Sequence, residues 1–145
     1  MIIIGDGGHA KVIRSFPPAE GTIIAVGNNR DRYREAEAHK GEIFATLIHP
    51  DASINNPVSI GEGTVIMAGA VVQPGVTIGK HVIINTGATV DHDCTIGDYT
   101  HIAPGVHLCG GVVVGEGALV GVGSCAVPGA KIPAWSLVKA GSIVK

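Results

Sequence analysis

From residue 48 onward, aliphatic residues recur at every sixth position of the chain. Seventeen successive positions follow this rule, and only Ala126 among them is small. They are Ile48, Ile54, Ile60, Ile66, Val72, Ile78, Ile84, Val90, Ile96, Ile102, Leu108, Val114, Val120, Ala126, Ile132, Val138 and Val144. Because no insertion shifts the register, residues 48–145 are predicted to form one repeating architecture.

Two further positions of each six-residue unit are restricted. The residue four places after each aliphatic is never larger than valine. The residue three places after it is usually glycine, which predicts a sharp turn with positive φ. These glycines are Gly63, Gly69, Gly75, Gly87, Gly105, Gly111, Gly117, Gly123, Gly129 and Gly141. An α-helix repeats every 3.6 residues or so and a sandwich strand alternates every second residue, so neither fits.

The six-residue pattern resembles the hexapeptide-repeat, left-handed parallel β-helix. In that fold three short strands form an eighteen-residue coil, and successive coils stack about 4.8 Å apart. Sixteen hexads predict slightly more than five coils, with the aliphatic side chains along the axis.

Residues 1–47 do not follow the repeat. Their pattern predicts a strand over 1–4, a short helix over 9–15, a strand over 22–26, a charged surface helix over 30–40 and a third strand over 42–47. We expect a reduced, Rossmann-like α/β domain over 1–47, too small to be stable alone, that docks on the first coils or on a neighbouring subunit. The β-helix domain is then residues 48–145.

The first predicted loop contains Gly5-x-Gly7-x-x-Ala10 between a strand and a helix, which fits the phosphate-binding turn of dinucleotide folds. A complete NAD site also needs an acidic residue at the end of the second strand. Here that strand ends in Val26-Gly27-Asn28, so a dehydrogenase is not favoured.

Composition narrows the function classes. Net charge is −2 and charged residues make up 15 %, without a basic stripe, which disfavours nucleic-acid binding. No apolar run is long enough to span a membrane, and no basic segment follows Met1 as in a signal peptide. The three cysteines form no CxxC pair. We therefore expect a cytoplasmic protein with reduced thiols.

Five segments together resemble one family, the bacterial sugar acetyltransferases that join a small nucleotide-sugar-binding domain to a left-handed β-helix. The segments are 4–9 (IGDGGH), 25–29 (AVGNN), 48–50 (IHP), 85–88 (NTGA) and 91–102 (DHDCTIGDYTHI). The resemblance implies N-acetylation of a nucleotide-activated amino sugar for surface glycans. It further implies acetyl-CoA as co-substrate, no metal, and a homotrimer with active sites between subunits.

The outward-facing His92 stands between two acids, and a positioned imidazole is suited to general-base catalysis. The resemblance makes His92 the base and Asp93 the acid that raises its basicity, although relatives often have Glu at that place. Since neighbours on a straight strand point in opposite directions, their contact requires a corner, and Asp91 is the alternative partner. Gly110 follows His92 by eighteen residues, so we expect it one coil away, with its N–H available to a developing oxyanion.

The resemblance also implies two sets of binding residues. His101, Val122 and Ala140 are expected along the acetyl-CoA groove. Expected at the nucleotide sugar are Gly7, Gly8, His9, Gly27, Asn28 and Asn85. Asn85 precedes His92 by seven residues and is not in its column, so a shared site requires a bend or a second chain.

Three other functions stay open. The related sialic acid O-acetyltransferases would use a hydroxyl acceptor in place of an amine. A non-catalytic scaffold is compatible with a first domain that is shorter than in relatives between Ser15 and Thr22. A zinc-dependent carbonic anhydrase of the same fold needs three histidine ligands. It is disfavoured because four of the histidines (His81, His92, His101 and His107) share no column with suitable spacing.

Overall fold

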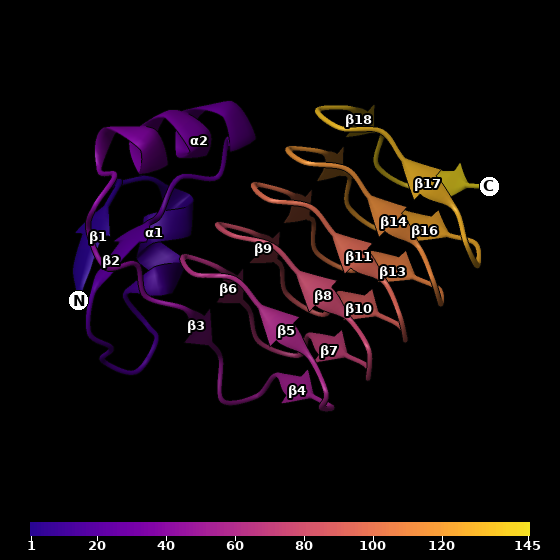
Figure 1. Ribbon diagram of the computed structural model, residues 1–145, viewed down its shortest axis with the longest axis horizontal. Coiled ribbons are helices and arrows are strands. Elements are labelled where there is room, and N and C mark those ends of the chain that lie inside the picture. The colour runs from indigo at the N-terminus through magenta and orange to yellow at the C-terminus, as the bar shows by residue number, and fades with distance from the viewer.

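A computed structural model describes residues 1–145 as a small α/β unit packed along one side of a long β-helix (Figure 1). The α/β unit contains β1 (Ile2–Ile4), α1 (Gly8–Ile13), β2 (Thr22–Ile24) and α2 (Asn29–Ala38), and β1 pairs with β2 in parallel. The prediction of a left-handed parallel β-helix of hexapeptide repeats, preceded by a reduced α/β unit, is confirmed.

The β-helix is built from three parallel sheets, one on each side of the coil. Sheet I contains β3 (Leu47–Ile48), β6 (Val65–Ile66), β9 (Ile83–Ile84), β12 (His101–Ile102), β15 (Leu119–Val120) and β18 (Leu137–Val138). Sheet II contains β4 (Ser53–Ile54), β7 (Val71–Val72), β10 (Thr89–Val90), β13 (His107–Leu108), β16 (Cys125–Ala126) and β19 (Ile143–Val144). Sheet III contains β5 (Ser59–Ile60), β8 (Thr77–Ile78), β11 (Thr95–Ile96), β14 (Val113–Val114) and β17 (Lys131–Ile132).

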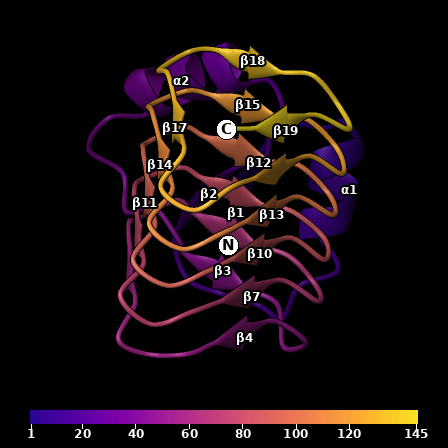
Figure 2. The ribbon, with the colours of Figure 1, turned by 90° about the vertical axis from the view of Figure 1, so that its right-hand side faces the viewer.

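Every strand pairs with the one a full coil away. Ile84, for example, is in register with Ile66 on one side and Ile102 on the other. Seen from the side that carries the C-terminus, successive coils appear as similar loops, each displaced from the one before it (Figure 2). A cluster of 22 buried residues, nearly all from the aliphatic position of the hexad and the small-residue position four places later, fills the axis. Burying these aliphatic groups supplies the main driving force for stacking the coils.

The corners have the predicted positive φ at the glycine position of the hexad. From residue 63 to residue 141, every sixth residue has positive φ, and ten of them are the predicted glycines. The other four are His81, Asp93, Tyr99 and Trp135, with φ between 52° and 60°. A side chain in this conformation costs about 1–2 kcal/mol relative to glycine, so each must be held by contacts of its own.

The α/β unit packs on the outside of the β-helix in two places. Beneath α1, the side chains of Ala10, Ile13 and Phe16 share a core cluster with Val65 and Ile83 on the outer face of sheet I. Beneath α2, a second cluster brings Ala36 onto Tyr99 at the corner between sheets III and I.

The aromatic residues of this corner hold α2 in place. The ring of Tyr33 meets those of Tyr99 and Trp135 edge to face, at 5.0 Å and 6.0 Å between centroids. The Arg30 guanidinium lies 4.9 Å from the Trp135 ring centre. The unit therefore docks on more than the first coils, because Trp135 belongs to the last full coil.

Three details differ from the prediction. The helices and the second strand begin or end within two residues of their expected bounds. The third strand predicted over 42–47 is reduced to a single bridge between Thr22 and Phe44, and the chain enters sheet I already at Leu47. The charged helix α2 is not purely a surface helix, because the Arg32 side chain on it is buried.

Candidate active site

His92 and its acidic neighbours lie at the corner between sheets II and III. The Asp93 backbone is in the left-handed region, at φ 60°, and this turn brings two consecutive side chains together. Nδ1 of His92 lies 2.9 Å from Oδ2 of Asp93, so the contact that the sequence made conditional on a corner is present. Asp91 accepts a hydrogen bond from the His92 backbone N–H at 2.8 Å.

This arrangement sets the chemistry of the imidazole. The hydrogen bond to Asp93 and the charge of Asp91 raise the pKa of His92 above its usual value. In neutral His92 the proton is on Nδ1, which donates a hydrogen bond to the Asp93 carboxylate. Nε2 therefore carries the lone pair. The side chain is 62 % exposed, which leaves Nε2 open to an acceptor.

Gly110 lies one coil from His92, as the eighteen-residue spacing predicts. The N–H of Gly111 donates to the His92 carbonyl at 2.9 Å, which fixes the two corners side by side. A Cβ added to Gly110 would meet Nε2 of His92 at 2.5 Å, so the ring lies directly over this glycine. The Gly110 N–H has no hydrogen-bond partner within the chain. It is therefore a free donor beside the free lone pair.

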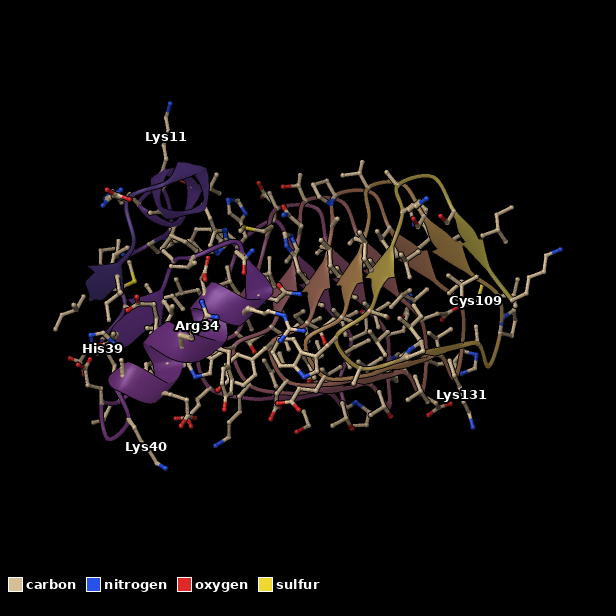
Figure 3. All side chains as sticks on the ribbon, turned by 90° about the horizontal axis from the view of Figure 1, so that it is seen from above. Lys11, Arg34, His39, Lys40, Cys109 and Lys131 are labelled. Atoms are coloured by element: carbon tan, nitrogen blue, oxygen red, sulfur yellow. The ribbon has the colours of Figure 1, made fainter.

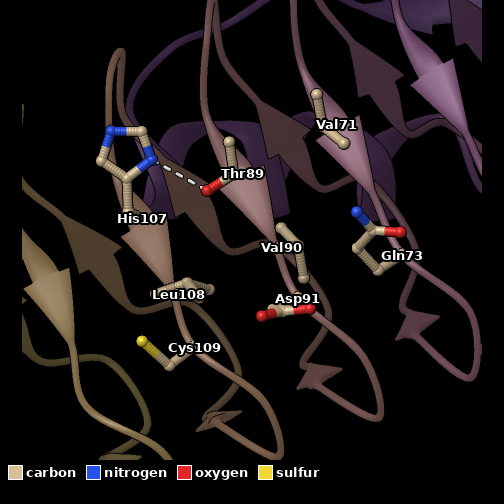
Figure 4. A pocket seen from close by; sticks show the side chains of 8 residues that line it. All are labelled: Val71, Gln73, Thr89, Val90, Asp91, His107, Leu108 and Cys109. Atoms are coloured by element: carbon tan, nitrogen blue, oxygen red, sulfur yellow. Dashed lines mark hydrogen bonds between the residues drawn. The ribbon is translucent and has the colours of Figure 1, made fainter.

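A hollow of about 250 Å³ on the outer face of sheet II leads to this corner (Figure 4). Two of its lining residues, Asp91 and Cys109, directly precede His92 and Gly110 in the sequence. They therefore mark the end of the hollow that adjoins the corner. Across its other end Thr89 and His107 are hydrogen-bonded, with 2.8 Å between Oγ1 and Nδ1.

The second group of candidate residues lies around His101, on the outer face of sheet I. Nδ2 of Asn85 is 3.0 Å from Nε2 of His101, and the Asn85 oxygen accepts the N–H of Thr86 at 2.8 Å. With its oxygen so engaged, the Asn85 amide donates to His101, and the proton of a neutral His101 is on Nδ1. This contact joins a residue expected at the acetyl-CoA groove to one expected at the nucleotide sugar.

His101 is held neutral at physiological pH. Burial and the positive charge of Arg32 lower the pKa of His101 to about 4. A hydrogen bond with the Gly27 backbone raises this pKa by a smaller amount. Burial and Arg32 likewise lower the pKa of His9 to about 4. Nε2 of His9 is buried without a hydrogen-bond partner.

A pocket of about 360 Å³ in the α/β unit collects most of the expected sugar-nucleotide residues. Gly7, Gly8, His9 and Gly27 line it together. At its edge Gly5 has φ 119°, and a Cβ there would lie 2.6 Å from the Ala25 carbonyl oxygen, so only glycine fits.

Asn28 does not line this pocket. Its side chain caps α2 by accepting the N–H groups of Arg30 and Asp31, at 3.0 Å and 3.1 Å. Val122 and Ala140 lie one coil apart at the corner between sheets I and II, and Val122 is 55 % exposed.

The expected site residues of one chain therefore form two groups on different sides of the β-helix. His92, Asp93 and Gly110 lie at the corner between sheets II and III. The His101 group, with Asn85 and the pocket of the α/β unit, lies on sheet I and its corner with sheet II. The hollow beside His92 and the pocket of the α/β unit have no lining residue in common.

Sequence reasoning missed Arg32, the largest fully buried side chain of the protein. The Tyr33, Tyr99 and Trp135 contacts were also missed, although non-glycine residues at glycine positions of the hexad could have marked this corner. No group of three or more His, Cys, Asp or Glu side chains is arranged to hold a metal ion. No helix is both long and apolar enough to cross a membrane.

Comparisons with known proteins match this architecture. Residues 57–92 match the profile of the family described as bacterial transferase hexapeptide (six repeats). The acetyltransferase domain of PglB from Neisseria gonorrhoeae superposes with a TM-score of 0.93 at 33 % identity, covering 99 % of this chain and 90 % of that one.

The descriptions of two further relatives mention nucleotide sugars. PerB from Caulobacter crescentus, solved with CoA and GDP-perosamine, superposes with a TM-score of 0.90 at 36 % identity, covering 99 % of this chain and 87 % of that one. The UDP-N-acetylbacillosamine N-acetyltransferase of Bacillus subtilis (strain 168) is 42 % identical over 47 % of this chain. The match spans about half of that relative, 51 % of its length.

Proposed function

The chain belongs to the hexapeptide-repeat sugar acetyltransferases, and we propose that it transfers the acetyl group of acetyl-CoA to the amino group of a nucleotide-linked amino sugar. The observation that carries the proposal is the His92–Asp93 pair, whose free Nε2 lies over Gly110 at an exposed corner. Support also comes from the PglB domain, solved with acetyl coenzyme A, and from PerB, solved with CoA and GDP-perosamine.

In the proposed reaction His92 acts as the general base. The acceptor amine attacks the thioester carbonyl carbon, and Nε2 takes the proton that the amine loses as the C–N bond forms. Asp93 accepts the Nδ1 hydrogen bond and stabilises the imidazolium. When the C–S bond breaks, the imidazolium returns the proton to the departing thiolate of CoA. A base of this kind contributes about 10²–10⁴-fold to the rate.

Gly110 is proposed to stabilise the negative charge on the thioester oxygen. Its N–H has no partner within the chain and is held one coil from His92 by the Gly111–His92 hydrogen bond. A donor that is already in place needs no reorganisation when the oxyanion forms. One corner thus supplies both the base and the oxyanion donor.

We further propose that the site is completed by a neighbouring copy in a homotrimer. Within one chain the His92 corner and the His101 group lie on different sides of the β-helix. In a ring of three copies, the His92 corner of one faces the sheet I side of the next. The acceptor is then held by Gly7, Gly8, His9 and Gly27 of one copy, while His92 of the other acts on it.

The acetyl-CoA groove in this proposal runs along the corner between sheets I and II, past Val122 and Ala140, to His101. The Asn85–His101 hydrogen bond lies where the donor and acceptor sites meet. The role of Asn28 is indirect, since its side chain caps α2. The three free thiols and the use of CoA suit a cytoplasmic location.

The catalytic assignment is tested with His92→Ala. Because the His92 side chain is 62 % exposed, its removal leaves the core intact. We expect kcat with acetyl-CoA and nucleotide-linked 4-amino sugars to fall about 10²-fold or more, as followed by free thiol release. His39→Ala, at the end of α2, is the matched control and keeps the wild-type rate. Full turnover by His92→Ala would rule out the general-base role.

The choice of acceptor and the trimer are tested separately. The acceptor panel includes hydroxyl sugars, and transfer only to hydroxyls would favour the O-acetyltransferase alternative. For the trimer, His92→Ala and His101→Asn chains are co-expressed with different tags. In a homotrimer of either variant, every interface lacks one of the two histidines. After random mixing, about a quarter of the interfaces contain both native histidines, so we expect mixed trimers to regain activity. If mixed trimers stay inactive, each site lies within one chain.

A further inference from the structure

Arg32 is buried to an extent unusual for a charged residue. Its side chain is 1 % exposed, although α2 carries five other charged residues that are not buried. Arg34, two residues along, is 74 % exposed and is labelled on α2 in Figure 3. A cation removed from water is costly unless its hydrogen bonds are replaced.

The buried guanidinium binds oxygen atoms from two separate parts of the chain. On the α/β side, Nη1 donates to the carbonyls of Val26 and Gly27, both at 3.0 Å. On the β-helix side, Nε donates to the His81 carbonyl and Nη2 to the Tyr99 carbonyl, each at 2.8 Å.

Two weaker or local contacts complete the set. Nη2 also donates to the Asn29 side chain at 2.8 Å and to the Thr100 carbonyl at 3.3 Å. None of these partners is a carboxylate. The planar fork of arginine fits several fixed carbonyls at once, which the single ammonium of lysine cannot do.

These partners adjoin the proposed acceptor site. Gly27 lines the pocket of the α/β unit, and Thr100 directly precedes His101. We infer that Arg32 is a positioning residue, which fixes the Gly27 wall of the acceptor pocket against His101 on sheet I. Its kinetic consequence rests on the proposed function, whereas its effect on the two histidines does not.

The charge of Arg32 supports this role independently of its hydrogen bonds. After burial, Arg32 is the largest influence that lowers the pKa of His9 and of His101, each to about 4. His9 is the other titratable group acting on His101, and no acidic side chain opposes them. Burial lowers the pKa of Arg32 itself to about 9, so it remains charged at neutral pH. Arg32 thereby keeps His101 in the neutral form that accepts from Asn85.

The experiment separates positioning from general stabilisation with two substitutions. Arg32→Lys keeps the charge and loses the fork, while Arg32→Met removes both. Arg34→Met, on the same helix and in solvent, is the control. Kinetic constants are measured with the nucleotide sugar varied, and His9 and His101 are titrated by NMR, with His9→Asn and His101→Asn used to assign the signals.

With Arg32→Lys we expect KM for the nucleotide sugar to rise about tenfold or more while kcat changes less than about threefold, because substrate binding is lost and the chemistry is retained. With Arg32→Met we also expect both histidine pKa values to rise by about one unit or more. Arg34→Met changes neither quantity.

Two results would overturn the inference. One is an Arg32→Lys protein with unchanged KM, including the case in which only its apparent kcat falls, in proportion to the loss of folded protein. The other is histidine titration in Arg32→Met identical to the wild type. If the wild-type protein shows no transferase activity, the proposed function fails, and the titration alone still decides the role of Arg32. If Arg32→Met does not fold, Arg32→Lys decides it by the histidine titration, where low pKa values are expected to persist, and by KM.

Discussion

Two adjacent glycines at one corner are predicted to respond to alanine in opposite ways. Gly110 does not have a positive φ, so alanine fits its backbone, but the new Cβ would lie 2.5 Å from Nε2 and 2.6 Å from Cε1 of His92. Gly111 has φ +70° and open space around it, so alanine there strains the backbone and touches nothing. Alanine at Gly110 is therefore expected to displace His92 without destabilising the fold. Alanine at Gly111 is expected to destabilise the fold without displacing His92.

For Gly110→Ala the imidazole must give way. Contacts under 3 Å between carbon and ring atoms are not sustained, and the exposed ring can turn toward solvent at little cost in folding free energy. Turning it breaks the alignment of Nδ1 with Asp93 and moves Nε2 away from the acceptor. We expect kcat to fall about 10²-fold, within the range that general-base catalysis supplies.

For Gly111→Ala the cost is to stability. A non-glycine residue in the left-handed region costs about 1–2 kcal/mol in unfolding free energy. Thiol-release kinetics measure the first effect, and urea unfolding measures the second. The reasoning is refuted if Gly110→Ala retains wild-type kcat with its fold intact, or if Gly111→Ala is the inactive variant of the two.

Two further predictions concern pH. Asp93→Asn removes the main cause of the raised pKa of His92, so the acid limb of the kcat/KM profile moves to lower pH and its plateau falls; an unmoved limb would contradict the pairing. His9 and His101 have folded pKa values of about 4, so the unfolded chain binds more protons and stability falls as pH drops from about 6.5 to 4. Each shift corresponds to at most about 3 kcal/mol. Urea unfolding of the His9→Asn, His101→Asn double variant should show a flatter pH dependence, and an unchanged slope would refute it.

The four non-glycine corners distinguish functional strain from packing. Asp93 is held at positive φ by its place beside His92, where the turn creates the ion-pair geometry. His81 and Tyr99 stack one coil apart at 5.3 Å between centroids, and Trp135 meets Tyr33. Strain at the first corner therefore serves the proposed chemistry, and strain at the other three is offset by docking of the α/β unit.

The β-helix was predictable from the sequence because its repeat is a local rule applied many times. Each hexad states which side chain points inward, which must be small and where the chain turns, and an uninterrupted period of eighteen fixes every neighbour along the axis. The adjacency of His92 and Gly110 follows from that arithmetic. The His92–Asp93 contact was conditional on a corner, and the hexad position of Asp93 is where the corner lies.

What the period cannot describe is how residues 1–47 sit on the repeat, and only the tertiary structure decided it. Arg32 resembled one more charge on a solvated helix, yet five of its six hydrogen bonds go to backbone carbonyls between five and sixty-eight residues away. Carbonyl groups carry no sequence signal, so their convergence is visible only after docking. The neutral state of His101 has the same origin, because burial and a buried cation depend on which surfaces meet.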